Sequence, residues 1–210
     1  MKHIFISLRM TFFLMVVLGI AYPVAVTLVA QGIFPTQANG SLIYEDGKLR
    51  GSELIGQSFE SPGYFWSRPS AVGYNPMPSG GSNLGPTAQG LKDAVKERAE
   101  KLGAQNPGLG DPPQHLLFAS SSGLDPHQSV AALEYQSQRV AQARGMPVGD
   151  VQKLIAAHTE SRQLRLFGEE VVNVLALNRA LDKLKPQRPT QEPAPNESTG
   201  DQHSSDSSGN

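Results

Sequence analysis

The residue types that could do covalent chemistry gather in one short stretch. Three consecutive serines, Ser120 to Ser122, precede Asp125 and His127. Serine, histidine and an orienting carboxylate are the groups of a nucleophilic hydrolase, provided that the serine sits on a fixed turn within reach of the histidine. The nucleophile-elbow pattern Gly-x-Ser-x-Gly is missing, and Asp125 is also placed to cap a helix. The sequence therefore predicts no catalytic residue, while a hydrolase at this stretch stays open as the alternative function.

A glycine-rich loop is the second candidate site. It consists of Ser79, Gly80, Gly81, Ser82 and Asn83, whose backbone amides could face an anion such as a phosphate. It is not a P-loop, because no Gly-Lys-Ser/Thr follows, and the spacing of a dinucleotide fingerprint is also absent. A tight connection with left-handed backbone angles is the simpler interpretation, since glycine allows such angles.

Composition excludes several other sites. The chain of 210 residues has no cysteine, which rules out disulfides, a zinc–thiolate site and a cysteine nucleophile. Its five histidines are scattered, so no metal site is predicted. The net charge of -1 argues against nucleic-acid binding, which needs a clustered positive surface.

An aromatic cluster precedes a lone arginine. Tyr64, Phe65 and Trp66 stand just before Arg68, and aromatic residues grouped with arginine are typical of the anchors of a protein interface. The same grouping is also typical of an ordinary core corner. The sequence leaves both interpretations open.

The first element that helps to position these residues is a long uncharged stretch from Met10 to Ala30, which follows a short basic N-terminus. As a helix it is long enough to cross a hydrocarbon core of roughly 30 Å. Lys2 and Arg9 precede it and no charge follows before Glu45, which predicts a cytoplasmic N-terminus and an extracytoplasmic remainder. A cleaved signal peptide is the rival interpretation, but its apolar region spans only about 7–15 residues. We expect an uncleaved single-span anchor.

Small residues and a proline mark the middle of this anchor. Gly19, Ala21 and Ala25 would let a neighbouring helix approach closely. Pro23 has no amide proton, so it leaves the Gly19 carbonyl without its usual helical partner. Both a simple kinked anchor and a helix packed against membrane partners fit this pattern.

The first half of the remaining chain favours strands and loops. Two short apolar segments flank Asp46-Gly47, which predicts a hairpin over residues 41–50. The stretch 58–86 is crowded with glycine and proline, which indicates a long loop of the functional or interfacial kind. The apolar run Leu116 to Ala119 predicts a buried strand, and a second strand is expected over Gln163 to Phe167.

The second half favours helices. Apolar spacing predicts one helix from Ala88 to Leu102, ended by Gly103, and a second opened by Asp125 as its N-cap and ended by Gly145. Two further helices are expected, one over Val148 to Ile155 and a final one over Val174 to Leu184. Strands mixed with unequal helices indicate an α+β domain.

These patterns divide the chain into four parts. Residues 1–9 form the cytoplasmic N-terminus, 10–34 the transmembrane helix and its exit, and 35–184 one extracytoplasmic α+β domain. Residues 185–210 hold four prolines and almost nothing apolar, so they cannot bury enough surface to offset the entropy of ordering. We expect them to form a disordered tail.

An ordered set of short motifs carries a family resemblance through nearly all of the chain up to Leu184. The motifs are Tyr22-Pro23, Asn39-Gly40-Ser41-Leu42-Ile43, Gly51-Ser52, Leu54-Ile55-Gly56-Gln57 with Phe59, Tyr64-Phe65, Arg68-Pro69-Ser70-Ala71, Tyr74-Asn75-Pro76, Ser79 to Leu84, Ser122 to His127, Arg139-Val140-Ala141 with Ala143-Arg144, Val172-Asn173-Val174, Leu177-Asn178 and Ala180-Leu181-Asp182. Together they resemble the C subunit of the bacterial high-affinity potassium-transporting (Kdp) P-type ATPase.

The resemblance implies an accessory subunit in the bacterial inner membrane. In that family one partner subunit hydrolyses ATP through a phospho-aspartate and another binds potassium, beside any small single-span subunit. Neither an Asp-Lys-Thr-Gly motif nor a Thr-Val-Gly-Tyr-Gly filter occurs in this chain. The C subunit is described as stabilising the complex and as a catalytic chaperone that raises ATP affinity.

For the site residues, the resemblance assigns any nucleotide contact to the Ser79–Asn83 loop, with ATP bound mainly by the partner. The charge pattern, however, puts this loop on the side of the membrane that lacks ATP. The alternative to an accessory subunit is a free-standing membrane-anchored extracytoplasmic hydrolase or binding protein.

Overall fold

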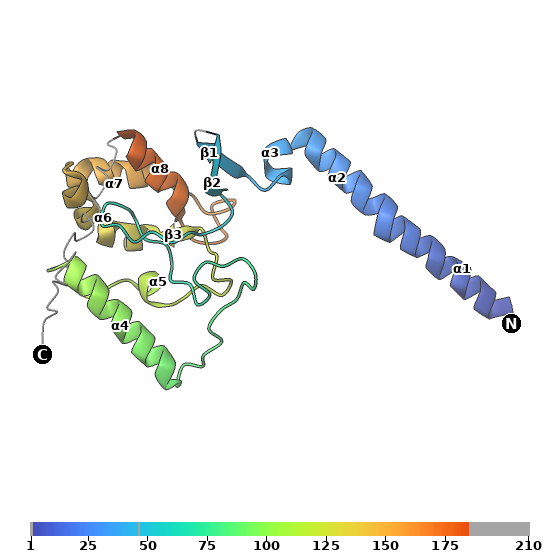
Figure 1. Cartoon of the computed structure of the whole chain (residues 1–210), viewed down its shortest axis with the longest axis horizontal. Helices are drawn as coiled ribbons and strands as arrows, with labels where there is room; N and C mark the ends of the chain where they lie inside the picture. The colour runs from blue at the N-terminus through green and yellow to red at the C-terminus, as the bar shows by residue number, and fades with distance from the viewer. Residues whose placement is uncertain (1, 46, 185–210) are drawn as a thin grey trace, which may run out of the picture.

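A computed structural model describes residues 2–45 and 47–184 of the chain. It consists of one long N-terminal helix that projects from a folded α+β domain, as Figure 1 shows. The predicted α+β class is confirmed. The predicted tail, residues 185–210, lies outside the described residues.

The N-terminal helix is longer than the predicted span. It runs without interruption from Lys2 to Ile33 as α1 (Lys2–Val16), a π-helical turn (Val17–Ala21) and α2 (Tyr22–Ile33). The π-helical turn directly precedes Pro23, and within it the Tyr22 amide donates to the Val17 carbonyl, five residues back. The wider turn is how the helix accommodates a proline that cannot donate.

A short helix and a hairpin link this anchor to the domain. After α3 (Pro35–Ala38), strands β1 (Leu42–Glu45) and β2 (Lys48–Ser52) pair antiparallel, which confirms the predicted hairpin. Hydrogen bonds tie the hairpin to the exit of the anchor: Ser41 N donates to Thr36 O over 2.9 Å, and Ser52 Oγ to Gly40 O over 2.7 Å.

A second antiparallel sheet lies in the domain, with strand order β3-β5-β4. Its strands are β3 (His127–Ser129), β4 (Thr159–Glu160) and β5 (Val171–Asn173). The helices are α4 (Gln89–Gln105), α5 (Gln114–Leu117), α6 (Val130–Arg144), α7 (Val148–Ala157) and α8 (Val174–Leu184). The two helices expected over 148–155 and 174–184 are thereby confirmed.

The core lies where α6, α7 and α8 meet the second sheet. Its fully or almost fully buried members are Phe65, Leu133, Val140, Ala141, Val151, Ile155, Val172, Val174, Leu177 and Leu181. A smaller cluster of Leu102, Leu116, Ala132 and Tyr135 joins α4 and α5 to the other face of α6. Periodic apolar residues form most of both clusters, as amphipathic helices require.

Two sequence predictions of strands were wrong. Leu116 and Leu117 belong to the helical turn α5, in which the buried Leu116 packs in the smaller cluster; a short apolar run does not by itself separate a strand from a buried helical turn. Residues 163–167 form a closed turn in which Gln163 and Phe167 bond to each other, and strand β4 lies earlier, at Thr159–Glu160.

Two predicted helix ends were also wrong. Helix α6 starts at Val130 with Ser129 as N-cap, whose Oγ accepts from Ala132 N, because residues 127–129 pair with β5 and so delay the helix. Helix α4 continues through Gly103 to Gln105, and Asn106 ends it by donating from Nδ2 to Leu102 O over 2.9 Å. At the other end of α6, Gly145 stops the helix as predicted, with φ of 59°.

Candidate functional site

The serine stretch and the glycine-rich loop, far apart in sequence, lie against each other. Gly80 N donates to Ser122 O over 2.9 Å, and a Cβ built on Gly81 would stand 3.1 Å from Ser121 O. A Cβ on Gly123 would stand 2.9 Å from Gly80 O, and the φ of +69° at Gly123 is one that glycine adopts easily. The glycines thus let two backbone segments approach closely.

This contact shapes what the glycine-rich loop can bind. The Gly80 amide is already committed to Ser122, while Ser79, Ser82 and Asn83 are exposed. Asn83 has φ of 52°, the left-handed angle expected of a tight connection. The structure therefore supports the simpler interpretation of the loop as a tight connection, and a nucleotide contact stays a prediction.

Asp125 does not serve as the orienting group of a catalytic triad. Its Oδ2 accepts from Arg68 Nη1 over 2.9 Å, and its Oδ1 accepts from His127 N over 3.0 Å. His127 Nδ1 lies 3.9 Å from Asp125 Oδ1, beyond hydrogen-bond distance. Asp125 therefore closes a turn before β3, which replaces its predicted role as helix cap.

The serines also have structural partners. Ser120 is buried and its amide donates to Pro69 O over 2.9 Å, while Ser122 Oγ accepts from Leu124 N over 3.1 Å. The three serines line a shallow cavity of about 480 Å³ with Arg68 and Asp125. Among the described residues no hydrogen bond joins a serine hydroxyl to His127.

The aromatic cluster is a core corner. Phe65 is fully buried, and Asn178 brackets its backbone, accepting from Phe65 N over 2.9 Å and donating to Phe65 O over 3.0 Å. At the next residue, Trp66 N donates to Gln136 Oε1 over 2.8 Å. Buried side-chain amides thus bond this extended segment much as a neighbouring strand would.

Two buried arginines from α6 also bond to the backbone of residues 62–64. Arg139 Nη1 donates to Pro62 O over 2.6 Å and its guanidinium lies 4.2 Å from the centre of the Trp66 ring. Arg144 Nε donates to Gly63 O over 2.6 Å, and its Nη2 pairs with Asp182 of α8 over 2.8 Å. Burial lowers the pKa of Arg139 to about 10, because taking the charge out of water disfavours the protonated form.

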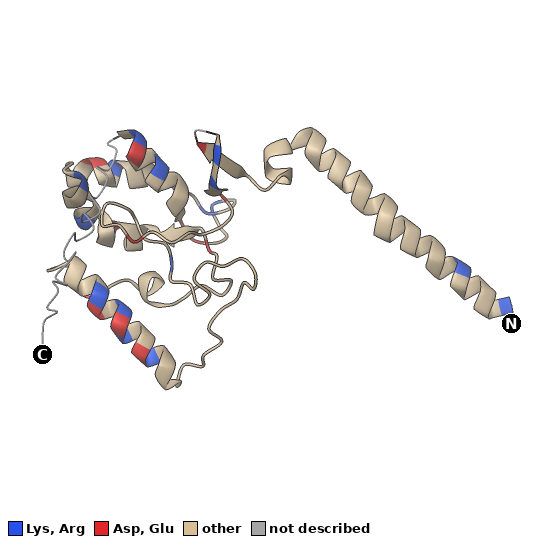
Figure 2. Ribbon diagram, viewed as in Figure 1, with Lys and Arg blue, Asp and Glu red and all other residues tan. Residues whose placement is uncertain are grey.

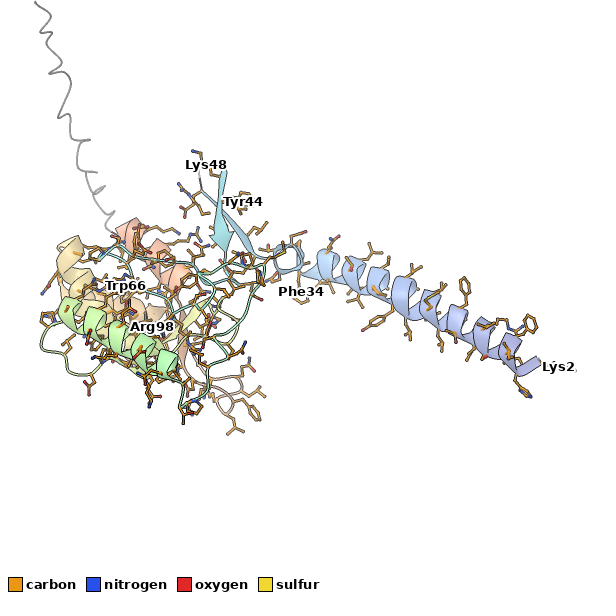
Figure 3. All side chains as sticks on the ribbon, turned by 60° about the horizontal axis from the view of Figure 1, so that its bottom comes forward. Lys2, Phe34, Tyr44, Lys48, Trp66 and Arg98 are labelled. Atoms are coloured by element: carbon orange, nitrogen blue, oxygen red, sulfur yellow. The ribbon has the colours of Figure 1, made fainter. Side chains whose placement is uncertain are left out.

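Trp66 also lines a cavity of about 190 Å³. Arg98 of α4 lies on this side of the domain with Trp66, as Figure 3 shows, and its Nη1 donates to Leu117 O over 2.8 Å. Tyr74, another lining residue, donates to Arg68 O over 2.8 Å, and burial raises its pKa to about 12. The cavity therefore lies between α4 and the 58–74 loop, and the side chains of Arg98 and Tyr74 that line it are bonded to backbone carbonyls.

The anchor is the remaining candidate. In Figure 2 its charged residues, Lys2 and Arg9, stand at one end, and the rest of the helix carries no charge. The apolar window of this 32-residue helix is 0% buried, and a Cβ on Gly19 would meet nothing within 4 Å. Its apolar side chains are therefore left for a bilayer or another helix to cover.

Sequence reasoning gave no structural role to the polar residues that hold residues 62–66, although Arg139, Arg144 and Asn178 stand in the family motifs. Gln136, Arg139, Arg144 and Asn178 interrupt otherwise apolar helix faces. Because buried polar side chains need hydrogen-bond partners, polar residues at these helix positions predict bonds to a neighbouring segment. That pattern could have identified them from the sequence.

Comparison with known proteins agrees with the resemblance found in the sequence. Residues 4–183 match the family described as K+-transporting ATPase, c chain, or KdpC. The chain is 54% identical over 191 residues to a potassium-transporting ATPase KdpC subunit of Polaromonas naphthalenivorans, covering 89% of this chain and 97% of that protein. It is 51% identical over 187 residues to proteins of the same name from Burkholderia mallei and Burkholderia pseudomallei. Each of these matches covers 87% of this chain and 97% of the relative. With its apolar N-terminal helix and its α+β domain, the chain belongs to the KdpC family, the c chain of the K+-transporting ATPase.

Proposed function

We propose that this protein is a non-catalytic accessory subunit that stabilises an ATP-driven potassium uptake complex. The observation that carries the proposal is the Lys2–Ile33 helix, whose apolar surface is not covered by the described part of the chain. In a family named for a K+-transporting ATPase, partner subunits are the natural source of helices that pack on it. Ion translocation and ATP hydrolysis then belong to those partners.

The middle of the anchor supports this role. Gly19, Ala21 and Ala25 are small, and no atom lies within 4 Å of a Cβ placed on Gly19. Small residues let helix backbones approach closely in a bilayer, where packing rather than the hydrophobic effect drives association. We therefore expect a partner helix to cross the anchor near its π-helical turn.

The orientation follows from charge. Lys2 and Arg9 at one end of the anchor favour a cytoplasmic N-terminus, so we propose that the domain lies outside the cytoplasm of a bacterial inner membrane. A cysteine introduced as Ser82→Cys in this cysteine-free chain then reacts with a membrane-impermeant thiol reagent in intact spheroplasts. Labelling only after lysis would reverse the orientation.

A role in ATP affinity is the finer part of the proposal. The family resemblance suggests a catalytic chaperone, with ATP bound mainly by the hydrolysing partner and the Ser79–Asn83 loop as the nearest candidate contact. Two features weigh against a direct contact: the Gly80 amide is occupied by Ser122, and the proposed orientation puts the loop on the side without ATP. We therefore favour an effect on ATP affinity that is transmitted through subunit packing.

Purification from native membranes tests the proposed function. The full chain carrying an affinity tag should bring down an ATP-hydrolysing and a potassium-binding subunit, together with potassium-stimulated ATPase activity. The alternative, a free-standing anchored hydrolase with Ser120–His127 as its site, predicts a chain that purifies alone. Recovery without any ATPase activity would reject the subunit assignment.

A further inference from the structure

The loop between β4 and β5 exposes a group of large apolar side chains. All residues from Ser161 to Glu170 are exposed, and Leu164, Leu166 and Phe167 have exposed fractions of 88%, 72% and 59%. In Figure 3 the loop projects below the domain. Contiguous apolar groups left uncovered on a folded domain mark an interaction site.

The tip of this loop has a defined shape. Gln163 and Phe167 exchange two backbone hydrogen bonds of 2.9 Å each, and Leu166 N donates to Gln163 O over 3.1 Å. Leu164 and Arg165 have φ of 52° and 60°, angles that residues with side chains seldom adopt. Such a turn defines the backbone from which Leu164 and Leu166 project, which suits a shaped socket better than a fluid surface.

The charges around the tip discriminate between a protein and a lipid surface. Arg162 and Arg165 lie beside the apolar side chains, and neither makes an ion pair with another residue of the described part of the chain. Glu169 and Glu170 follow directly, so the loop has no net charge. An anionic bilayer therefore exerts no net attraction on it, whereas a protein surface can match each charge separately.

We propose that Leu164, Leu166 and Phe167 insert into an apolar socket on a partner subunit of the transporter, with carboxylates on the socket rim facing Arg162 and Arg165. This inference rests on the proposed function, because it requires a partner in the complex. The loop then gives the domain an attachment separate from the anchor. Two linked attachments hold a subunit far more tightly than either one alone.

Thiol protection tests the loop directly, because the chain has no cysteine of its own. Leu166→Cys is labelled with a water-soluble maleimide in two samples, the purified full chain in detergent and the purified complex. The expected result is labelling at least tenfold slower in the complex. Ala104→Cys is the control, since Ala104 is an exposed residue of helix α4, outside both the 58–86 and the 161–170 loops, and its labelling rate should be the same in both samples.

The socket rim is tested by charge reversal. In the complex, Arg165→Glu should raise the labelling rate of Leu166→Cys several-fold, because the loop would then meet like charges. Arg50→Glu, on the exposed hairpin, serves as the control and should leave that rate unchanged. Equal effects of the two reversals would contradict the acidic rim.

Each outcome decides the proposal. Equal labelling of Leu166→Cys in the free chain and in the complex would overturn the loop as an attachment, while co-purification would still support the subunit assignment. Slow labelling of the chain reconstituted alone into phosphatidylglycerol vesicles would show that lipid covers the loop, which also overturns the protein socket. A chain that recovers no partner at all would overturn both the subunit assignment and the socket.

Discussion

The anchor and the core of the domain both consist mainly of apolar residues, yet they are stabilised in opposite ways. In the domain, Phe65, Leu133 and Leu177 are fully buried by other parts of the same chain. In the anchor, the apolar side chains from Ile4 to Phe34 are mostly exposed. The comparison indicates that the domain contains the interactions that fold it, whereas the described part of the chain leaves the apolar side chains of the anchor uncovered.

The domain and the anchor also differ in how their side chains bond to the backbone. Residues 62–66 of the domain have their backbone bonded by buried Gln136, Arg139, Arg144 and Asn178. In the middle of the anchor the side-chain bond is instead local and exposed: Thr27 Oγ1 donates to Pro23 O, four residues earlier in the same helix, over 2.8 Å. Mutations in the buried core of the domain should therefore act on folding, and mutations in the anchor on assembly.

Phe65→Ala should have the largest effect. Removing a fully buried phenylalanine deletes its burial and leaves a cavity, which typically costs about 3–5 kcal/mol. Urea unfolding of the detergent-solubilised chain, followed by the fluorescence of its only tryptophan, Trp66, measures the loss. Phe118→Ala, at a more exposed position, should lower the free energy of unfolding much less. Equal decreases for the two variants would contradict the view that buried side chains of the domain stabilise its fold.

Asn178→Leu should rank second. It leaves Phe65 N and Phe65 O without partners in a buried site, and a buried unpaired polar group costs about 1–3 kcal/mol. The free energy of unfolding should fall by roughly 2 kcal/mol or more, measured in the same way. Gln89→Leu is the control, because Gln89 is exposed and donates only to Asp93; if Asn178→Leu behaved like this control, the bracket around Phe65 would not matter for stability.

Gly19→Leu should leave folding unchanged but weaken assembly. The larger side chain keeps the helix apolar while pushing a neighbouring helix away. We expect several-fold less ATP-hydrolysing subunit in a pull-down and poor growth at low potassium. The matched control is Gly32→Leu near the end of the anchor, where a Cβ also meets nothing within 4 Å. Normal recovery of partners with Gly19→Leu would show that the anchor does not mediate assembly.

Deleting residues 186–210 should have the smallest effect. The segment lies outside the described part of the chain. Its composition gives it little apolar surface to bury. The melting temperature should change by no more than a few degrees, as measured by circular dichroism; a larger drop would show that the tail packs on the domain.

The sequence predicted the parts of the fold that local patterns encode. Apolar periodicity placed α7 and α8, and Asp46-Gly47 placed the hairpin. It failed where a distant partner decides the local structure. His127 was assigned to a helix because Asp125-Pro126 is a good helix start, but pairing with Asn173, far along the chain, makes it part of a strand.

The candidate sites likewise fall into those formed by residues far apart in the chain and those that a local sequence pattern identifies. The contact of Gly80 with Ser122, and the bracket that Asn178 forms around Phe65, join residues far apart in the chain. No spacing rule encodes such pairs, because they depend on how the helices and loops pack. Local patterns alone identified the anchor, since its length and lack of charge are themselves the relevant property.

The central claim, that this chain acts in the complex without doing chemistry, is tested most directly by restoring activity to membranes that lack it. Wild-type chain and a Ser121→Ala/Ser122→Ala/His127→Gln variant are each expressed in cells without the natural subunit, and potassium-stimulated ATPase activity is measured in the isolated membranes. Both should restore it to the same level. A folded, partner-bound variant that restores no activity would contradict the account, because it would show that the Ser120–His127 region takes part in the reaction.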